Sequence, residues 1–232
     1  MLLMLLMLER EQSSLIWSDE FTSFDVNKWT KAPANWTDLY GSTAAWDPAL
    51  VTQSGSTIRL ACQKVGSVWN GSLINTLGKA QWTYGYFECR CKVPKGVGMW
   101  SAFWMMPAQP AYGGWPLSGE VDILEYIGTP QEEGAGYSTL HYDSVSPSVS
   151  AQTGGDLSQD FHVWGCLHTP GEFKFYLDNV LYGTLNVGQP FDQPFFFLLN
   201  LAVGGAWAGE PEDISSGKYL EVDYVRVYAP AA

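Results

Sequence analysis

The chain is poor in positive charge. Its 232 residues include 12 Lys and Arg against 24 Asp and Glu, which gives a formal net charge of −12 at pH 7. A surface of this sign repels the phosphates of nucleic acids and the headgroups of anionic membranes. We therefore expect neither nucleic acid nor a membrane as a partner, whereas a neutral sugar polymer is compatible with the charge.

Cysteine is scarce, and its spacing argues against a zinc site. The sequence has no C-x-x-C pair, which is the usual spacing of structural zinc ligands. Cys89 and Cys91 are two residues apart, so they would share one face of a strand and are poorly placed to bridge each other. Two alternatives stay open for the four cysteines, one disulfide or buried free thiols: Cys62, Cys89, Cys91 and Cys166.

Long apolar runs are also missing. Residues 1–8 are apolar, but eight residues are too few to span a bilayer. Neither a basic segment nor a small-residue cleavage site marks a complete signal peptide. We expect residues 1–12 to be an N-terminal tail or the remnant of a secretion signal. Residues 13–232 are expected to form a single domain, because no linker or internal repeat interrupts them.

No window has the apolar period of a helix. Short β-type segments recur instead, separated by Gly, Pro, Asn and Asp. About a dozen such segments predict an all-β fold, a two-sheet antiparallel β-sandwich (jelly roll) with a concave cleft. Loops rich in Gly, Pro and Ser, at 107–118, 128–136 and 143–160, are the expected rims. The expected strands are 14–17, 57–63, 73–79, 84–93, 99–106, 119–127, 137–142, 161–168, 172–178, 180–186, 195–203 and 219–228.

Aromatic residues are abundant, with 11 Trp, 12 Tyr and 11 Phe. Trp and Tyr present flat apolar faces on which sugar rings can stack. Most of these rings must nevertheless belong to the core of a β-protein. The high aromatic content is therefore compatible with carbohydrate binding but does not require it.

Three carboxylates fall within six residues of one expected strand. Glu120 and Asp122 are two apart and share a face, whereas Glu125 is five from Glu120 and would turn into the core of a regular strand. An uncompensated buried carboxylate is costly. One extra residue, a β-bulge at about Ile123-Leu124, would return Glu125 to the common face, and bulges often re-aim side chains beside active sites.

Two carboxylates that face one cleft can hydrolyse a glycosidic bond, because one attacks or activates and the other protonates the leaving oxygen. The plain alternative is a solvated strand face that carries scattered acids. The Trp-rich segments that flank the carboxylates make this alternative less attractive.

Residues 115–125, WPLSGEVDILE, resemble the signature of glycoside hydrolase family 16 in its bulged form, which is typical of laminarinase-type endo-β-1,3-glucanases. The resemblance covers nearly the whole chain. Its further segments, in order, are 17–21 (WSDEF), 84–88 (YGYFE), 100–104 (WSAFW), 200–205 (NLAVGG) and 222–228 (VDYVRVY).

The resemblance implies a retaining endo-β-1,3-glucanase. Glu120 is the expected nucleophile and Glu125 the expected acid and base, while Asp122 orients Glu120 and raises the pKa of its neighbours by like charge. Alternatives within the family are enzymes acting on mixed-linkage glucan, agarose or carrageenan, although sulfated carrageenan would require more basic residues. A non-catalytic β-glucan-binding protein and a jelly-roll lectin are alternatives from another class.

The resemblance and the strand pattern also predict residues that contact the sugar chain. Trp100 and Trp104 share a strand face, with small Ala102 between them leaving room for a ring. His141 is expected near Glu125, where an imidazole would tune the acid. For Arg90, a surface ion pair is the open alternative to a sugar contact. The full predicted set is Arg90, Trp100, Trp104, Trp115, His141, Asn200 and Trp207.

No cofactor is expected for catalysis. Many relatives hold a structural calcium ion away from the cleft, and the matching positions are Glu20, Gly55 and Asp223, whose oxygens suit a hard cation. We expect a secreted, extracellular monomer whose partner is a β-glucan polysaccharide.

Overall fold

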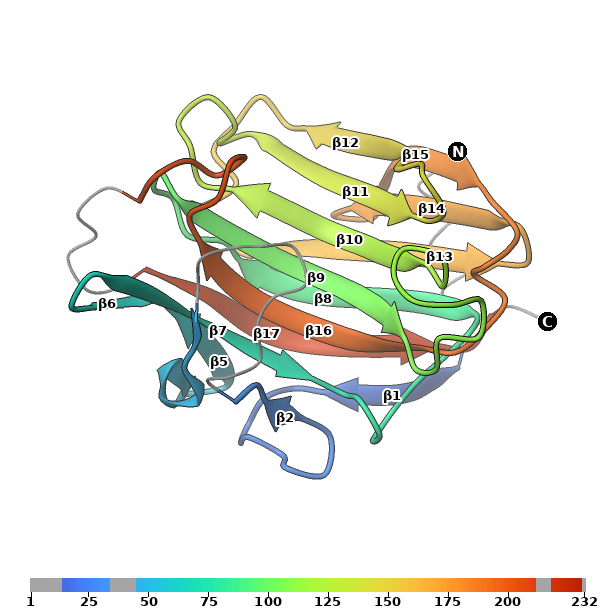
Figure 1. The fold of residues 1–232 in the computed structure, drawn as a ribbon, viewed down its shortest axis with the longest axis horizontal. Coiled ribbons are helices and arrows are strands. Elements are labelled where there is room, and N and C mark those ends of the chain that lie inside the picture. The colour runs from blue at the N-terminus through green and yellow to red at the C-terminus, as the bar shows by residue number, and fades with distance from the viewer. Residues whose placement is uncertain (1–13, 34–44, 212–217, 231–232) are drawn as a thin grey trace.

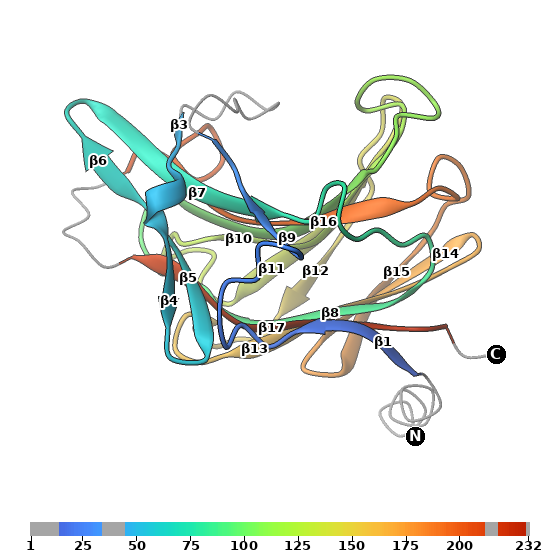
Figure 2. The same ribbon diagram turned by 90° about the horizontal axis from the view of Figure 1, so that it is seen from below.

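Two antiparallel sheets pack face to face in this protein (Figures 1 and 2). The structure, a computed structural model, describes residues 14–33, 45–211 and 218–230. The expected tail at residues 1–12 lies outside these ranges. No helix in the described ranges has the length and apolar character needed to cross a membrane.

The back sheet has eight strands within the described residues. Strand β1 pairs with β17 beside the main path. The order is β15 (Val180–Asn186), β14 (Glu172–Leu177), β13 (His162–Thr169), β8 (Gly85–Lys92), β17 (Tyr219–Tyr228), β5 (Thr57–Ala61) and β4 (Val51–Ser54), with β1 at Leu15–Asp19.

The cleft sheet has nine strands in the same ranges, and β3 and β6 pair with β7 beside its main path. A short 3-10 helix, Pro48–Leu50, precedes β4. The order is β12 (Ser148–Gln152), β11 (Ala135–His141), β10 (Glu120–Ile127), β9 (Met99–Pro107), β16 (Phe195–Val203), β7 (Val68–Asn75) and β2 (Thr30–Lys31), with β3 at Ala45–Trp46 and β6 at Gln63–Val65.

Strand β9 lies between β10 and β16 near the middle of the cleft sheet, and its alternation separates core from cleft. Met99, Phe103 and Met105 are at most 2% exposed and belong to the core between the sheets. Trp100 and Trp104 point to the other face and are only partly buried. The predicted two-sheet β-sandwich is confirmed.

The predicted bulge is present in β10. Its register against β11 shifts between Asp122 and Glu125, and its register against β9 shifts between Asp122 and Leu124. Ile123 and Leu124 are both fully buried in the core, so two successive side chains point the same way. This extra inward residue returns Glu125 to the face that carries Glu120.

All four cysteines are free, which settles the open alternative in favour of thiols. Cys89, Cys91 and Cys166 lie in the core, and burial raises the pKa of the Cys62 thiol to about 11. Thiols so protonated react slowly with oxidants, because the thiolate is the reactive form.

Five short strands were not predicted. Each is only two to five residues long. Strand β12 lies inside the segment that we expected to be a loop, 143–160. Val149 and Ala151 alternate with its exposed polar side chains, but two apolar residues are too few to distinguish a strand from the surrounding loop. The unpredicted strands are β2, β3, β4, β6 and β12.

Candidate active site

The cleft sheet carries two adjoining hollows on its outer face. Trp100, Glu120 and Glu125 line both of them. The first, here called the Trp46 hollow, is completed by Trp46, Ala102, Trp104, Asp122, Asn200 and Ala202. The second, the Tyr137 hollow, is completed by Tyr137, Thr139, His141, Ser148 and Trp207. A chain lying across both hollows would pass directly over the two glutamates.

Glu125 has the environment of a carboxylic acid that stays protonated. Burial, and next the negative charge of Asp122, raise its pKa well above the ordinary value, while hydrogen bonds from Trp100 and Thr139 act in the opposite direction. The Trp100 indole N–H donates to Oε1 of Glu125 at 3.2 Å. The predicted like-charge effect of Asp122 on its neighbour is therefore present at Glu125.

Glu120 is held in a different way. Glu120 is 4% exposed, and its Oε2 accepts a 2.7 Å hydrogen bond from the indole N–H of Trp115. Trp115 itself is 43% exposed and comes from the loop that precedes β10. An indole donor stabilises the charged form of a carboxylate, which suits the nucleophile role that the resemblance predicts for Glu120.

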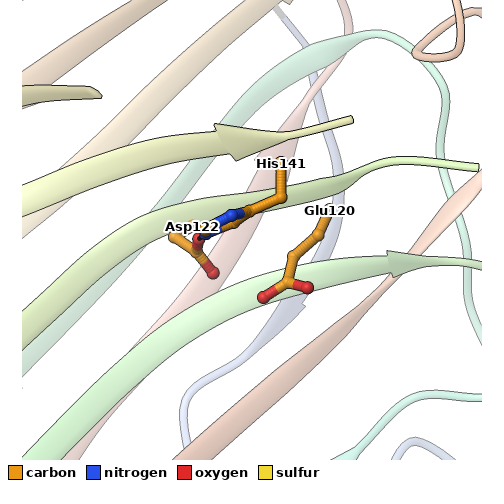
Figure 3. A group of neighbouring side chains, drawn as sticks. All are labelled: Glu120, Asp122 and His141. Carbon is orange, nitrogen blue, oxygen red and sulfur yellow. Dashed lines mark ion pairs between the residues drawn. The ribbon is translucent and has the colours of Figure 1, made fainter. Parts of the chain in front are cut away.

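His141 lies beside Asp122, as Figure 3 shows together with Glu120. Its Nε2 is 3.0 Å from Oδ2 of Asp122, and its Nδ1 is 2.8 Å from the Ser146 hydroxyl. Glu120 and His141 are opposite each other in the β10–β11 pair. His141 was predicted to lie near Glu125, and the two residues line the same hollow, but the direct partner of His141 is Asp122.

The remaining predicted aromatic and amide residues lie along the same face. Trp104 donates its indole N–H to Oδ1 of Asn200 at 2.7 Å, so the amide in this apolar strand is satisfied inside the cleft. Trp207 packs edge-to-face with Trp100 and with Tyr137, at centroid separations of 5.4 and 5.2 Å. Trp100, Tyr137 and Trp207 form one aromatic wall of the Tyr137 hollow.

Arg90 does not belong to this group, so its predicted contact with substrate is wrong. It lies on β8 of the back sheet, where its guanidinium pairs with Asp223 at 2.7 Å and stacks on Phe161 at 4.7 Å. Alternation correctly put Arg90 outside the core. It could not tell which of the two outer faces of the sandwich the residue occupies.

The residues expected to hold calcium do not fit a metal site as they stand. The carboxylate of Glu20 is paired with Arg226 at 2.7 Å, and Asp223 is paired with Arg90. The carbonyl of Gly55 accepts a 2.9 Å hydrogen bond from Gln53 Nε2, which also donates to the carbonyl of Phe21. Each expected ligand therefore already has a partner.

Sequence reasoning missed five residues that line the two hollows, namely Trp46, Tyr137, Thr139, Ser148 and Ala202. Trp46 comes from the two-residue strand β3, which pairs in parallel with β7, and no local pattern announces it. Tyr137 and Thr139 are four and two residues from His141 and share its face of β11, so the period of two could have indicated them. Ser148 begins the unpredicted β12.

Comparison with known proteins agrees with this geometry. Residues 40–226 match the family model described as "Glycosyl hydrolases family 16". The chain is 34% identical to a keratan-sulfate endo-1,4-beta-galactosidase of Sphingobacterium multivorum over 92% of its own length, and 38% identical to a beta-glucanase of Rhodothermus marinus over 70%. It spans 54% and 63% of these two curated relatives.

The fold matches solved structures over nearly its whole length. The X-ray structure of the laminarinase from Rhodothermus marinus superposes with a TM-score of 0.84 at 30% identity. The alignment covers 94% of this chain and 97% of the other.

Proposed function

Because this chain belongs to glycosyl hydrolase family 16, we propose that it cleaves internal β-1,3-glucosidic bonds of laminarin-type glucans with retention of configuration. The observation that carries the proposal is the pair of glutamates on bulged β10. Both line both hollows, and the pKa of Glu125 is raised. The family needs no cofactor for this chemistry.

In the first step, the carboxylate of Glu120 attacks the anomeric carbon. The bond to the leaving oxygen breaks, and Glu125 gives that oxygen its proton, so that the product is a glycosyl ester on Glu120. The raised pKa of Glu125 keeps this proton available at a higher pH than an ordinary glutamic acid would allow. The Trp115 hydrogen bond fixes Oε2 of Glu120 and so holds the carboxylate in one orientation for the attack.

In the second step, Glu125 is ionised and removes a proton from water. The water oxygen attacks the anomeric carbon, the ester bond to Glu120 breaks, and both carboxyl groups return to their starting states. A retaining enzyme needs the two carboxyl groups about 5–5.5 Å apart. Bulged β10 supports this step because it puts both on one face.

The charge of the cleft supports a neutral glucan as substrate. None of the described residues that line the two hollows is Lys or Arg. A relative is named for keratan sulfate, a sulfated chain, but sulfate groups would meet three carboxylates here with only His141 to offset them. Laminarin-type glucan therefore fits better than a sulfated galactan.

One assay tests the proposal against its alternatives. Reducing-end release is measured in parallel on laminarin, lichenan, agarose, carrageenan and keratan sulfate, with E120Q as the inactive control. We expect the highest rate on laminarin. Highest activity on another polymer would reassign the substrate. Binding of laminarin without hydrolysis by the wild type would instead indicate a glucan-binding protein or a lectin.

The predicted location follows from the same substrate. A glucan polymer cannot cross a membrane, so we propose that the enzyme acts outside the cell, and the monomeric state stays a prediction. Calcium binding by Glu20, Gly55 and Asp223 stays a prediction, and the arginine and amide partners of these residues count against it. An unchanged melting temperature in EDTA and in CaCl₂ would refute it.

A further inference from the structure

The side chains of Glu120, Asp122 and His141 are all of types that bind metal ions, and they lie close together (Figure 3). Each of them offers one oxygen or nitrogen atom, and the three atoms lie within 4.8 Å of one another. In a tetrahedral zinc site, ligand atoms at about 2.0–2.2 Å from the metal are about 3.3–3.6 Å apart. The three side chains therefore need only small rotations to share one ion.

Asp122 adds an independent observation. The residue is 3% exposed, and its Oδ2 accepts no hydrogen bond from any described residue. The imidazole Nε2 of His141 is nevertheless 3.0 Å away. A buried carboxylate oxygen in contact with a ring nitrogen, but without a well-aligned proton between them, is an incompletely satisfied acceptor. A metal ion bound to both atoms would satisfy it.

The His141 ring is already held in a way that suits a metal ligand. Nδ1 is 2.8 Å from the Ser146 hydroxyl, which leaves Nε2 turned toward Asp122. Ligating histidines commonly use their second nitrogen to bond a neighbour that fixes the ring. Glu120 accepts from Trp115 through Oε2, and a carboxylate has further lone pairs that can bind a metal.

The cluster also has an entry path. Glu120 and His141 line the Tyr137 hollow, so water or a substrate hydroxyl could complete the coordination from the cleft side. One imidazole and two carboxylates match the preferences of Zn²⁺ and its neighbours in the transition series, whereas Mg²⁺ and Ca²⁺ prefer oxygen ligands only.

We propose that Glu120, Asp122 and His141 bind one borderline transition-metal dication, of the Zn²⁺ or Co²⁺ type, and that the bound ion blocks the nucleophile. The ion engages the carboxylate that would attack the sugar, so metal and substrate exclude each other. This site is inhibitory, and its existence does not depend on which glucan the enzyme cleaves.

The test is direct binding to tag-free protein, first stripped with a chelator. Calorimetric titration with ZnCl₂ should show one site per chain, with MgCl₂ giving no comparable binding. Co²⁺ should give the intense visible absorption of a tetrahedral N,O site. H141Q should weaken Zn²⁺ binding at least about tenfold, because it replaces the only nitrogen ligand.

His162 provides the matched control. It contacts Asp178 at 2.7 Å on the back sheet, so it is a second His–Asp pair outside the cleft, and H162Q should bind Zn²⁺ like the wild type. Circular dichroism checks that each variant is folded, and D122N serves as a second variant. Absence of a stoichiometric site in the wild type, retention of binding by H141Q and D122N, or its loss in H162Q would each overturn the proposal. Failure of laminarin hydrolysis would leave these binding results unaffected.

Discussion

The indole N–H of Trp115 donates a 2.7 Å hydrogen bond to Oε2 of Glu120. Trp115 belongs to a loop and is 43% exposed, whereas Glu120 is 4% exposed on β10. A residue that sequence reasoning assigned to sugar stacking therefore also holds the expected nucleophile. Trp100 has the same relation to Glu125 at 3.2 Å, so each glutamate has its own indole donor.

The Trp115 hydrogen bond can be removed while the ring is kept. In W115F, we expect kcat to fall about tenfold, since loss of a hydrogen bond to a charged group costs about 1.5–3 kcal/mol and part of this is compensated by water. KM and the melting temperature should change little, because the side chain is half-exposed. The control is W207F, which makes the same exchange at another half-exposed indole of the cleft. A fall in melting temperature that parallels the loss of kcat would instead make Trp115 a structural residue.

The charge of Asp122 should be visible in the pH profile. Burial and the Asp122 charge raise the pKa of Glu125, and the free enzyme's acid sets the alkaline limb of kcat/KM. D122N removes the like charge, so the pKa of Glu125 falls and the alkaline limb moves to lower pH. D178N, which alters the Asp178 partner of His162, should leave the limb in place. An unmoved limb in D122N would remove Asp122 as a cause of the shift.

Stereochemistry can assign the two glutamates. With E125A and an aryl β-glycoside whose leaving group needs no acid, Glu120 still forms an α-linked ester, and added azide should give the β-glycosyl azide. With E120A, azide should attack the β-substrate directly and give the α-glycosyl azide. Product anomers are read by proton NMR. The same pair of products with the variants exchanged would reverse the roles.

His168 should make the fold sensitive to acid. It is 3% exposed and stacks on Phe173 at 3.9 Å, and burial lowers its pKa to about 4. The unfolded chain binds a proton near pH 6.5 that the folded chain refuses until about pH 4. The free energy of unfolding therefore falls as pH drops through this window, by up to about 3 kcal/mol from this group.

The measurement for His168 is denaturant unfolding at a series of pH values. H168F keeps a flat ring against Phe173 and removes the titrating group, so the dependence on pH between 6.5 and 4 should become shallower than in the wild type. The absolute stability of H168F does not enter this comparison. Equal slopes for the two proteins would contradict the assignment.

The sequence predicted those features that depend on periodicity within one strand. The bulge followed from the odd spacing of Glu120 and Glu125, and the two faces of β9 followed from the alternation of Trp100 and Phe103. Both depend only on a period of two and on the cost of burying a carboxylate.

Features that depend on the pairing of distant strands were not predictable in the same way. Arg90 was put on the wrong face because alternation does not say which sheet a strand joins. Trp46 was missed because β3 is two residues long and is positioned by β7. The contact of His141 with Asp122 depends on the register of β10 against β11, which no single strand encodes.

The bulge in β10 also constrains how such an enzyme can change over generations. Ile123 and Leu124 both fill the core, so no exchange of one side chain for another can convert this strand into one with the glutamates four residues apart. That conversion requires loss of a codon, and removal of Leu124 would leave a hole that costs several kcal/mol in a close-packed interior. Conversion between the two strand lengths therefore requires a second mutation that fills the space left by Leu124.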